Sequence, residues 1–418
     1  MEKFIIEHSG ALKGRVRISG SKNSVLPIIA ATLLTDEVCI MHDVPKLTDV
    51  LIMQNIIEDL GAKTIWNEEK LSIEVGDIKK TQVAYELCSK MRASFLVAGP
   101  ILARCGEVKI SLPGGCAIGS RPVDLHLKGL VALGAEISQE HGYIHARAKK
   151  LEGANIYLDF PSVGATENIM MAATLAEGQT IIQNAAVEPE IVDLSNFLSS
   201  MGAQIRGSGT DTIKITGVNR LRGTSHNIIP DRIEAGTFMC AAAVTGGDVF
   251  LENVVIDHLK PAIAKLREMG IEINEGFDDG IHIKGSLDRL PIDIKTLPYP
   301  GFPTDMQAQF LSLLAVTPGT NIVTETVFEN RFMHVPELIR MGADIKIDSR
   351  SAVIEGVAKL AGTQVRASDL RAGAALVIAA LAAAGTTEIH DIYHIDRGYY
   401  RFDEKLRALG AIIHRKTS

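Results

Sequence analysis

The sequence has few of the residues that mark the more specialised classes of protein. Its five cysteines are an odd number, and they include no Cys-x-x-Cys pair and no metal-ligand spacing. We therefore expect neither a disulfide framework nor a metal site. Long hydrophobic stretches are also missing, because the longest apolar run, 372–385, has only 14 residues. A helix needs about 20 apolar residues to cross a bilayer, so a membrane-spanning protein is not expected.

Positive charge is in short supply as well. Lysine and arginine number 43 against 50 aspartate and glutamate residues, which gives a net charge of −7. This balance argues against nucleic acid or an anionic membrane surface as the partner. Charges at Glu2, Lys3 and Glu7 interrupt what would be the apolar core of a signal peptide. The length of 418 residues, at roughly 150 residues per domain, predicts two to three domains. Together with the cysteine pattern, these observations indicate a reduced cytoplasmic enzyme.

The most informative pattern in the sequence is an internal repeat. Six times, an amphipathic helical pattern ends in Leu-Gly or Met-Gly, usually followed by Ala. The glycines stand at 61, 134, 202, 270, 342 and 410, at spacings of 73, 68, 68, 72 and 68 residues. Glycine in this place is typical of a helix C-cap, where it adopts a left-handed backbone without strain. Alternating strand pairs follow each glycine, and a helix that is apolar on nearly every side begins about 40 residues before it.

Each repeat is therefore predicted to contain a strand, a buried helix, a second strand, an outer helix and a strand pair. Three repeats with their buried helices at the centre would form one domain, so six repeats would form two α/β domains. We expect the boundary near 220–232. An elongated array of six repeats is the alternative, although solenoid repeats are normally shorter, about 20–50 residues.

Notable residues mark the beginnings of the buried helices. At matching positions, 37 to 42 residues before each glycine, stand Lys22, Arg92, Gly164, Arg232, Asp305 and Arg371. A charge there is costly if it is dry and unpaired, which indicates helix ends that open to water. Because helix N-termini attract anions, the set predicts an anion-binding cleft. Ion pairs that only hold the domain together are the alternative for each single residue.

Two further features suggest catalytic groups. Asp305, the one carboxylate of the set, is either an N-terminal helix cap or a general base that takes a proton from a hydroxyl group. The segment 112–125 has Cys116 at its centre, Arg121 nearby, and three glycines and two prolines within ten residues. An exposed Cys116 beside an arginine would have a lowered pKa and could act as a nucleophile or an acid. A small buried cysteine is the alternative, and the polar runs 187–190 and 329–331 have no function that spacing alone reveals.

Seven motifs carry a resemblance to a known family, and together they cover essentially the whole chain. They are Gly20-Ser21-Lys22-Asn23, PGGCAIGSRPVDL at 113–125, SVGATENIM at 162–170, EPEIVD at 188–193, FPTDMQAQF at 302–310, ENRFMHVPELIRMGAD at 329–344 and YHIDRGYYR at 393–401. On these motifs the sequence resembles the enolpyruvyl transferases, and in particular those whose acceptor is UDP-N-acetylglucosamine.

The resemblance implies a fold of two similar domains, each an inside-out α/β barrel of three repeats of about 70 residues, with the active site in the cleft between them. It implies one domain at 22–229 and a second at 1–21 plus 230–418. The implied reaction opens peptidoglycan synthesis. The 3-hydroxyl group of UDP-N-acetylglucosamine attacks C2 of phosphoenolpyruvate while C3 is protonated, and the intermediate then loses phosphate. No metal or other cofactor is needed, because phosphate is already the leaving group.

The resemblance also implies roles for individual residues. Cys116 is the proton donor that fosfomycin alkylates, Asp305 is the base, and Lys22 and Arg397 complete the catalytic set. The residues expected to bind the substrates are Lys22, Asn23, Arg92, Arg121, Pro122, Val123, Asp124, Leu125, Ser162, Val163, Gly164, Asp305, Val327 and Arg371. Some family members have a lysine just before the Ser-Val-Gly run. This chain has Phe160-Pro161 there, so stacking or backbone contacts would have to replace the lysine.

Three other activities are compatible with parts of this pattern. A shikimate-pathway enolpyruvyl transferase uses another acceptor, but Cys116 and the run 329–344 favour the UDP-sugar. An RNA 3′-phosphate cyclase shares the repeat, but a net charge of −7 disfavours an RNA substrate. A paralogue that binds the UDP-sugar without turnover is disfavoured because Lys22, Cys116, Asp305 and Arg397 are all present. The sequence does not decide between a monomer and a homo-oligomer.

Overall fold

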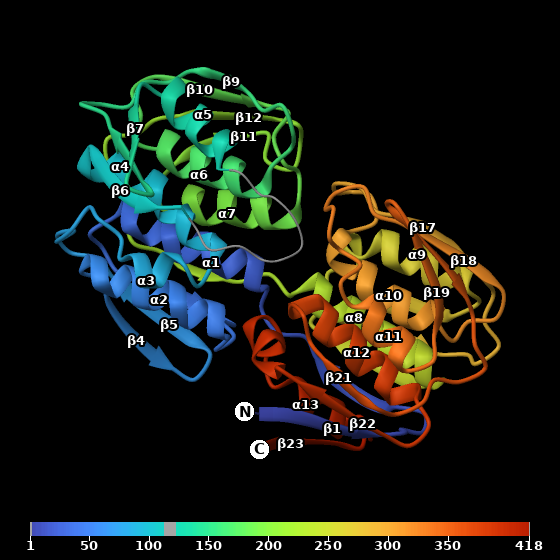
Figure 1. The fold of residues 1–418 in the computed structure, drawn as a ribbon. Coiled ribbons are helices and arrows are strands. Elements are labelled where there is room, and N and C mark those ends of the chain that lie inside the picture. The colour runs from blue at the N-terminus through green and yellow to red at the C-terminus, as the bar shows by residue number, and fades with distance from the viewer. Residues whose placement is uncertain (1, 113–122, 418) are drawn as a thin grey trace. The chain divides into compact units, whose positions relative to one another are not determined.

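The computed structural model describes residues 2–112 and 123–417. They form two compact units, which Figure 1 shows in full. The N unit comprises 20–112 and 123–229, and the C unit comprises 2–19 and 230–417. The six repeats therefore fold as two groups of three, and the elongated array is wrong. No helix of the described ranges combines the length and the apolar character needed to cross a membrane.

The N unit has its most buried helices at the centre. These are α1 (Lys22–Ala31), the consecutive η2 (Arg92–Val97) and α4 (Ala98–Cys105), and α6 (Val163–Ala173). The other helices are η1 (Thr32–Leu34), α2 (Thr48–Leu60), α3 (Tyr85–Cys88), α5 (Asp124–Ala132) and α7 (Pro189–Ser200). The strands are β3 (Cys39–His42), β4 (Lys63–Asn67), β5 (Lys70–Glu74), β6 (Glu107–Ser111), β7 (Glu136–Glu140), β8 (Tyr143–Arg147), β9 (Asn155–Tyr157), β10 (Gln179–Gln183), β11 (Gln204–Arg206), β12 (Thr212–Thr216) and β13 (Ser225–Asn227). Their sheet orders are β13-β3-β5-β4, β6-β8-β7 and β11-β12-β10-β9.

The C unit repeats this plan around α8 (Arg232–Thr245), α10 (Gln307–Leu314) and α12 (Leu370–Ala382). The other helices are η3 (Ile256–His258), α9 (Lys260–Glu268), η4 (Thr304–Met306), α11 (Val335–Arg340), η5 (Ile392–Arg397) and α13 (Phe402–Ala408). The strands are β1 (Glu2–Glu7), β2 (Lys13–Arg17), β14 (Asp248–Glu252), β15 (Glu272–Phe277), β16 (Gly280–Lys284), β17 (Asp293–Lys295), β18 (Thr320–Thr324), β19 (Asp344–Asp348), β20 (Ser351–Glu355), β21 (Gln364–Arg366), β22 (Thr386–His390) and β23 (Ile413–Thr417). Their sheet orders are β15-β16-β14-β2, β17-β18-β20-β19 and β21-β22-β1-β23.

The third repeat shows the predicted order of elements most clearly. Strand β9 is parallel to β10 and is joined to it through α6, while β12 is antiparallel to both β10 and β11. The six repeat glycines end their outer helices with φ angles between +85° and +117°. A left-handed residue at this point lets the chain leave the helix at once for the strand pair. The predicted C-caps are confirmed.

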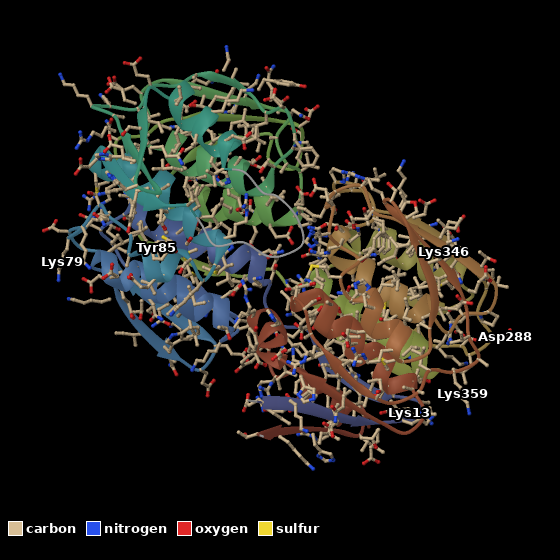
Figure 2. All side chains as sticks on the ribbon, in the orientation of Figure 1. Lys13, Lys79, Tyr85, Asp288, Lys346 and Lys359 are labelled. Carbon is tan, nitrogen blue, oxygen red and sulfur yellow. The ribbon has the colours of Figure 1, made fainter. Side chains whose placement is uncertain are left out.

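The central helices form the core of each unit. Every residue from Ile233 to Thr245 in α8 is buried, as is every residue from Arg371 to Leu381 in α12. The packing is equally close where α8 meets the residue before α10. Gly236 of α8 has no side chain and so leaves room for Met306. A Cβ atom at Gly236 would lie only 1.9 Å from Met306 Cε. Charged side chains such as Lys79, Lys346 and Lys359 instead project from the surface (Figure 2). The apolar pattern of the central helices is thus explained by burial on all sides.

The chain passes between the two units at 19–20 and again at 229–230. Before the first passage β2 pairs in parallel with β14 of the C unit, and before the second β13 pairs in parallel with β3 of the N unit. Each new segment is then fixed within its own unit. The Ser21 N–H donates to the Ile229 carbonyl (2.7 Å) in the N unit, and the Asp231 N–H donates to the Ser19 carbonyl (2.8 Å) in the C unit. Strand β1 completes the last sheet by pairing with both β22 and β23.

Candidate active site

The residues that the repeat alignment selects lie at the starts of the central helices, as predicted. Lys22, Arg92 and Arg232 are the first residues of α1, η2 and α8. Gly164 and Arg371 are the second residues of α6 and α12, and Asp305 lies in η4, directly before α10. Cys116, Arg121 and Pro122 lie outside the described residues. The other predicted residues fall into two clusters, one in each unit.

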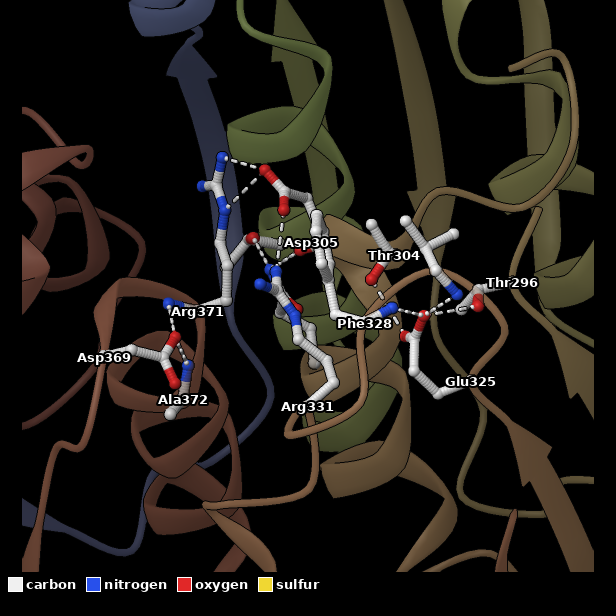
Figure 3. Close-up of polar contacts among 12 residues, drawn as sticks. Thr296, Thr304, Asp305, Glu325, Phe328, Arg331, Asp369, Arg371 and Ala372 are labelled. Atoms are coloured by element: carbon white, nitrogen blue, oxygen red, sulfur yellow. Dashed lines mark hydrogen bonds and ion pairs between the residues drawn. The ribbon is translucent and has the colours of Figure 1, made fainter. Parts of the chain in front are cut away.

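Asp305 is the centre of the cluster in the C unit (Figure 3). Its Oδ1 accepts a hydrogen bond from Arg331 Nη2 (2.7 Å), and its Oδ2 accepts from Arg371 Nε (3.2 Å) and Nη2 (3.0 Å). The Asp305 side chain is 29% exposed, whereas Arg331 and Arg371 are only 3% and 4% exposed. The N-cap residue of α10 is Met306 and not Asp305, and the ion pairs with Arg331 and Arg371 give the Asp305 carboxylate a contact beyond its own helix. Two buried cations fix this carboxylate while part of it stays open to solvent.

Arg371 is itself held on several sides. Asp369 caps α12 by accepting from the backbone N–H groups of Arg371 (2.9 Å) and Ala372 (3.1 Å). The guanidinium group lies over the Tyr399 ring, 5.5 Å from its centroid. Burial lowers the pKa of Arg371, but the charge of Asp305 and the phenol of Tyr399 outweigh it and leave the pKa raised. Arg371 therefore remains a cation at every accessible pH.

A second carboxylate, Glu325, lies beside Asp305 and is 1% exposed. Its Oε1 accepts from Thr296 Oγ1 (2.8 Å) and from the backbone N–H groups of Val327 (2.8 Å) and Phe328 (3.1 Å). Its Oε2 accepts from Thr304 Oγ1 (2.8 Å), as Figure 3 shows. Glu325 therefore joins the residue before Asp305 to the segment that contains Val327.

In the N unit, Lys22 forms a buried ion pair with Asp49. The Nζ–Oδ2 distance is 2.8 Å, and the side chains are 13% and 1% exposed. Two residues further along α1, the Ser24 hydroxyl donates to Asp193, whose Oδ1 also accepts from His226 Nε2 (2.8 Å). The first turn of α1, which Lys22 begins, is therefore held by polar contacts to other elements of the N unit. An ion pair, which was the alternative for such residues, is present here and at Arg371, and in both cases the cation still lies at a helix start.

Asn168, in the middle of α6, joins this helix to η2, α4 and α5 of the N unit. Its Oδ1 accepts from the Gly99 N–H (2.6 Å), and its Nδ2 donates to the Phe95 carbonyl (3.0 Å) and lies 3.1 Å from His126 Nδ1. Burial lowers the pKa of His126 to about 3, and the Arg92 charge contributes. Nδ1 of this neutral ring therefore accepts from Asn168.

The remaining predicted residues keep their expected places along the chain. Ser162 caps α6 by accepting from the Ala165 N–H (3.4 Å). Asn23, Leu125, Val163, Val327 and Arg397 are half-buried, Val123 is buried, and Asp124 is exposed. Phe160, which stands where some relatives have lysine, is 47% exposed. Together with burial, the Arg397 charge lowers the pKa of His394.

Sequence reasoning missed Asp49, Asn168, Glu325 and the role of Arg331. Asp49 had no marker beyond its position in α2, and Arg331 was placed in a polar turn without a function. Asn168 and Glu325 could have been found, because each is a polar residue at a place where the aligned repeats have a different type of residue.

Comparison with known proteins places this arrangement in a family. The sequence model of EPSP synthase (3-phosphoshikimate 1-carboxyvinyltransferase) matches residues 6–406. The enolpyruvyl transferase NikO from Streptomyces tendae has the same fold, with a TM-score of 0.90 at 24% identity over 100% of this chain and 99% of its own. EPSP synthase from Acinetobacter baumannii has a TM-score of 0.79 at 21% identity, and both chains are covered completely. The chain belongs to the enolpyruvyl transferase family.

Within that family, relatives of high sequence identity give a more specific comparison. UDP-N-acetylglucosamine 1-carboxyvinyltransferase 1 of Caldanaerobacter subterraneus is 63% identical, with 99% of both chains covered. UDP-N-acetylglucosamine 1-carboxyvinyltransferase 2 of Carboxydothermus hydrogenoformans is 61% identical, again over 99% of both chains. These names agree with the group of enolpyruvyl transferases that the motifs indicated, in which the acceptor is UDP-N-acetylglucosamine.

Proposed function

We propose that this protein is a UDP-N-acetylglucosamine 1-carboxyvinyltransferase. It transfers the enolpyruvyl group of phosphoenolpyruvate to the 3-hydroxyl group of UDP-N-acetylglucosamine and releases phosphate. The full-length relatives at 61–63% identity support the choice of acceptor. The observation that carries the chemistry is the Asp305 carboxylate, fixed by Arg331 and Arg371 and partly open to solvent.

Asp305 is suited to accept the proton of the sugar hydroxyl. Two buried guanidinium groups orient the carboxylate, so it does not have to reorganise when the substrate arrives. As the hydroxyl oxygen bonds to C2 of phosphoenolpyruvate, its proton passes to Asp305 and C3 takes a proton from Cys116. Loss of phosphate from C2, with return of a proton from C3, then leaves the enolpyruvyl ether.

Cations are required because both substrates are anionic. Phosphoenolpyruvate carries a carboxylate and a phosphate, and fixed arginine and lysine groups bind such anions through charge-assisted hydrogen bonds. We assign this task to Lys22, Arg92, Arg121, Arg371 and Arg397. Asn23 completes the phosphoenolpyruvate set. The residues assigned to UDP-N-acetylglucosamine are Pro122, Val123, Asp124, Leu125, Ser162, Val163, Gly164 and Val327, and no metal or cofactor enters a step.

Two finer points belong to the same proposal. Fosfomycin should inactivate the enzyme by alkylating Cys116, because the epoxide resembles phosphoenolpyruvate and a thiolate opens it. We place the enzyme in the cytoplasm, where the reaction would serve cell-wall synthesis during growth and division. The four cysteines of the described ranges, Cys39, Cys88, Cys105 and Cys240, are free thiols, which supports a reducing compartment.

The direct test is phosphate release from phosphoenolpyruvate by the purified protein. We expect turnover when UDP-N-acetylglucosamine is added and none when shikimate 3-phosphate replaces it. Turnover with shikimate 3-phosphate alone would favour the other branch of the family. Binding of UDP-N-acetylglucosamine without phosphate release would indicate a silent paralogue.

A further inference from the structure

Four of the six repeats end the strand that follows the central helix in the same way. The next residue is aspartate or asparagine in the left-handed conformation, with φ between 54° and 59°, at Asp43, Asn184, Asn253 and Asp391. In the two repeats with asparagine, the side chain bonds to the residue that follows the neighbouring parallel strand. Asn184 Nδ2 donates to the Leu158 carbonyl (2.7 Å), and Asn253 Nδ2 donates to the Ile18 carbonyl (2.8 Å). This contact occurs once in each unit and is a feature of the scaffold.

The fifth repeat, which carries Asp305, departs from this pattern. Its residue after β18 is Glu325, which is absent from the residues with positive φ. Glu325 contacts the same place in the repeat, because its partner Thr296 follows β17 as Leu158 follows β9. The direction of the hydrogen bond differs, since Glu325 accepts it and the asparagines donate it. The longer carboxylate also accepts at Oε1 from the backbone N–H groups of Val327 and Phe328, and at Oε2 from Thr304.

Burying a glutamate at this position costs free energy, and the other five repeats form the scaffold without one. A buried carboxylate is stable only if hydrogen-bond donors replace the water it loses. Glu325 is 1% exposed and has four such donors within 3.1 Å. Two of these are hydroxyl groups and two are backbone N–H groups, so the carboxylate fixes backbone as well as side chains. The segments that it fixes are the ones that carry Asp305 and Val327.

We propose that Glu325 is a positioning residue for the transfer reaction. Through the Thr304 hydroxyl it holds Asp305 in the orientation that accepts the sugar proton, and through two backbone N–H groups it holds the Val327 segment against the UDP-sugar. The inference rests on the proposed function. The effect on Asp305 can be tested separately from the effect on the Val327 segment, because Thr304 can be changed without changing Glu325.

The test removes one hydroxyl group and asks whether its effect passes through Asp305. Thr304→Val keeps the shape of the side chain but cannot donate to Glu325, and we expect kcat to fall about tenfold with KM for UDP-N-acetylglucosamine nearly unchanged. Thr304→Ser restores the donor and should restore kcat. The matched control is Thr324→Val, one residue before Glu325, whose hydroxyl bonds to Ser351 (3.0 Å). It should leave kcat within about twofold.

A double-mutant cycle then distinguishes positioning from general damage. In an Asp305→Asn background, Thr304→Val should lower kcat by less than about twofold, because the group that it positions is already gone. Glu325→Gln should lower kcat and raise KM for UDP-N-acetylglucosamine, since both branches depend on it. A tenfold loss from Thr304→Val in both backgrounds, or no loss in either, would overturn the inference. Lack of turnover by the unmodified protein would instead overturn the proposed function.

Discussion

A histidine stands eight residues before the outer-helix glycine in the second repeat and in the fifth. It is His126 in the N unit and His334 in the C unit. The other four repeats have a buried apolar residue at this position, namely Met53, Leu194, Ala262 and Phe402. The second and fifth repeats are also the ones that lack the left-handed Asp or Asn after the central strand, where they have Leu112 and Glu325. The same two places in the repeat have therefore been changed in both units.

The two repeats differ in the polar groups that surround these changes. His126 is hydrogen-bonded by Asn168, but the corresponding position on α12 is the buried Leu376, and His334 Nε2 has no hydrogen-bond partner within the described residues. The N unit thus uses a buried amide within its central helix α6 to join that helix to its neighbours. The C unit uses the buried carboxylate of Glu325, directly after β18, to fix the segment before its central helix. A common scaffold accepts either solution.

The largest expected effect tests the division of chemistry between Cys116 and Asp305. Cys116→Ser removes the proposed acid and should lower turnover by about 10⁴-fold, near the upper limit for general acid catalysis. Cys116→Asp can still hold a proton and should keep substantial turnover that declines as pH rises, and it should be insensitive to fosfomycin. Steady-state rates with and without fosfomycin measure both. Equal inactivity of the two variants, with normal UDP-N-acetylglucosamine binding, would show that the general-acid assignment is wrong.

The corresponding test of the C unit is Asp305→Asn. Loss of the base should lower turnover by about 10²–10⁴-fold, while UDP-N-acetylglucosamine affinity stays within roughly tenfold, because the arginines on either side remain. Calorimetric binding and steady-state kinetics on the same preparation separate the two quantities. If affinity fell as far as turnover did, Asp305 would be a binding residue and the C unit would not supply the base.

The sequence predicted the scaffold well and the site only in part. Glycines such as Gly342 predicted the repeat because a left-handed C-cap is a local requirement of the backbone. The cations at the helix starts were found because four of the six repeats have one at the aligned position. Asn168 was missed because its partners lie in another repeat, and Glu325 was missed because its partners are loop and strand-end residues, which local periodicity does not reveal. Comparison of the repeats position by position would have marked them as exceptions.

A smaller effect concerns the buried amide of the N unit. Asn168→Leu copies the residue of the C unit at this position, and it leaves the Gly99 N–H and the His126 ring without their partner. Each buried polar group that loses its partner costs about 1–3 kcal/mol, so we expect the free energy of unfolding to fall by about 2–4 kcal/mol. Denaturant titration measures it.

Asn321→Leu in the C unit is the matched control for Asn168→Leu. Asn321 is buried and its Oδ1 accepts from the Ile292 N–H (3.0 Å), so its loss should destabilise the protein to a similar extent. Only Asn168→Leu should also raise KM for UDP-N-acetylglucosamine, because Asn168 joins α6, which Ser162 caps, to η2, which begins with Arg92. An equal rise in KM for both variants would mean that destabilisation alone is responsible.

The last effect concerns the pH dependence of stability, to which both buried histidines contribute. Burial lowers the pKa of His126 to about 3 and also lowers the pKa of His334, while the unfolded chain binds the proton near pH 6.5. The unfolded state therefore takes up more protons, and each histidine lowers the free energy of unfolding by up to about 1.4 kcal/mol per pH unit as pH falls below 6.5.

Replacement of each histidine by leucine, the residue of the third repeat, provides the measurement. Both His126→Leu and His334→Leu should flatten the dependence of unfolding free energy on pH below pH 6.5. A slope that neither replacement changes would mean that the two rings are protonated in the folded protein.

The passage of the chain between the units has a consequence for the order of folding. The described residues of the N unit, 20–112 and 123–229, all precede the second part of the C unit, which begins with 2–19 and resumes at 230. Lys3 bonds to Glu388, 385 residues further along the chain, and β1 pairs with β22 and β23 near the other end. During synthesis the N unit can close its sheets while β1 and β2 still have no partners. The last sheet of the C unit can form only when β22 and β23 have emerged. The slow step of folding is therefore expected in the C unit, because contacts distant in sequence must wait for the longest loop to close.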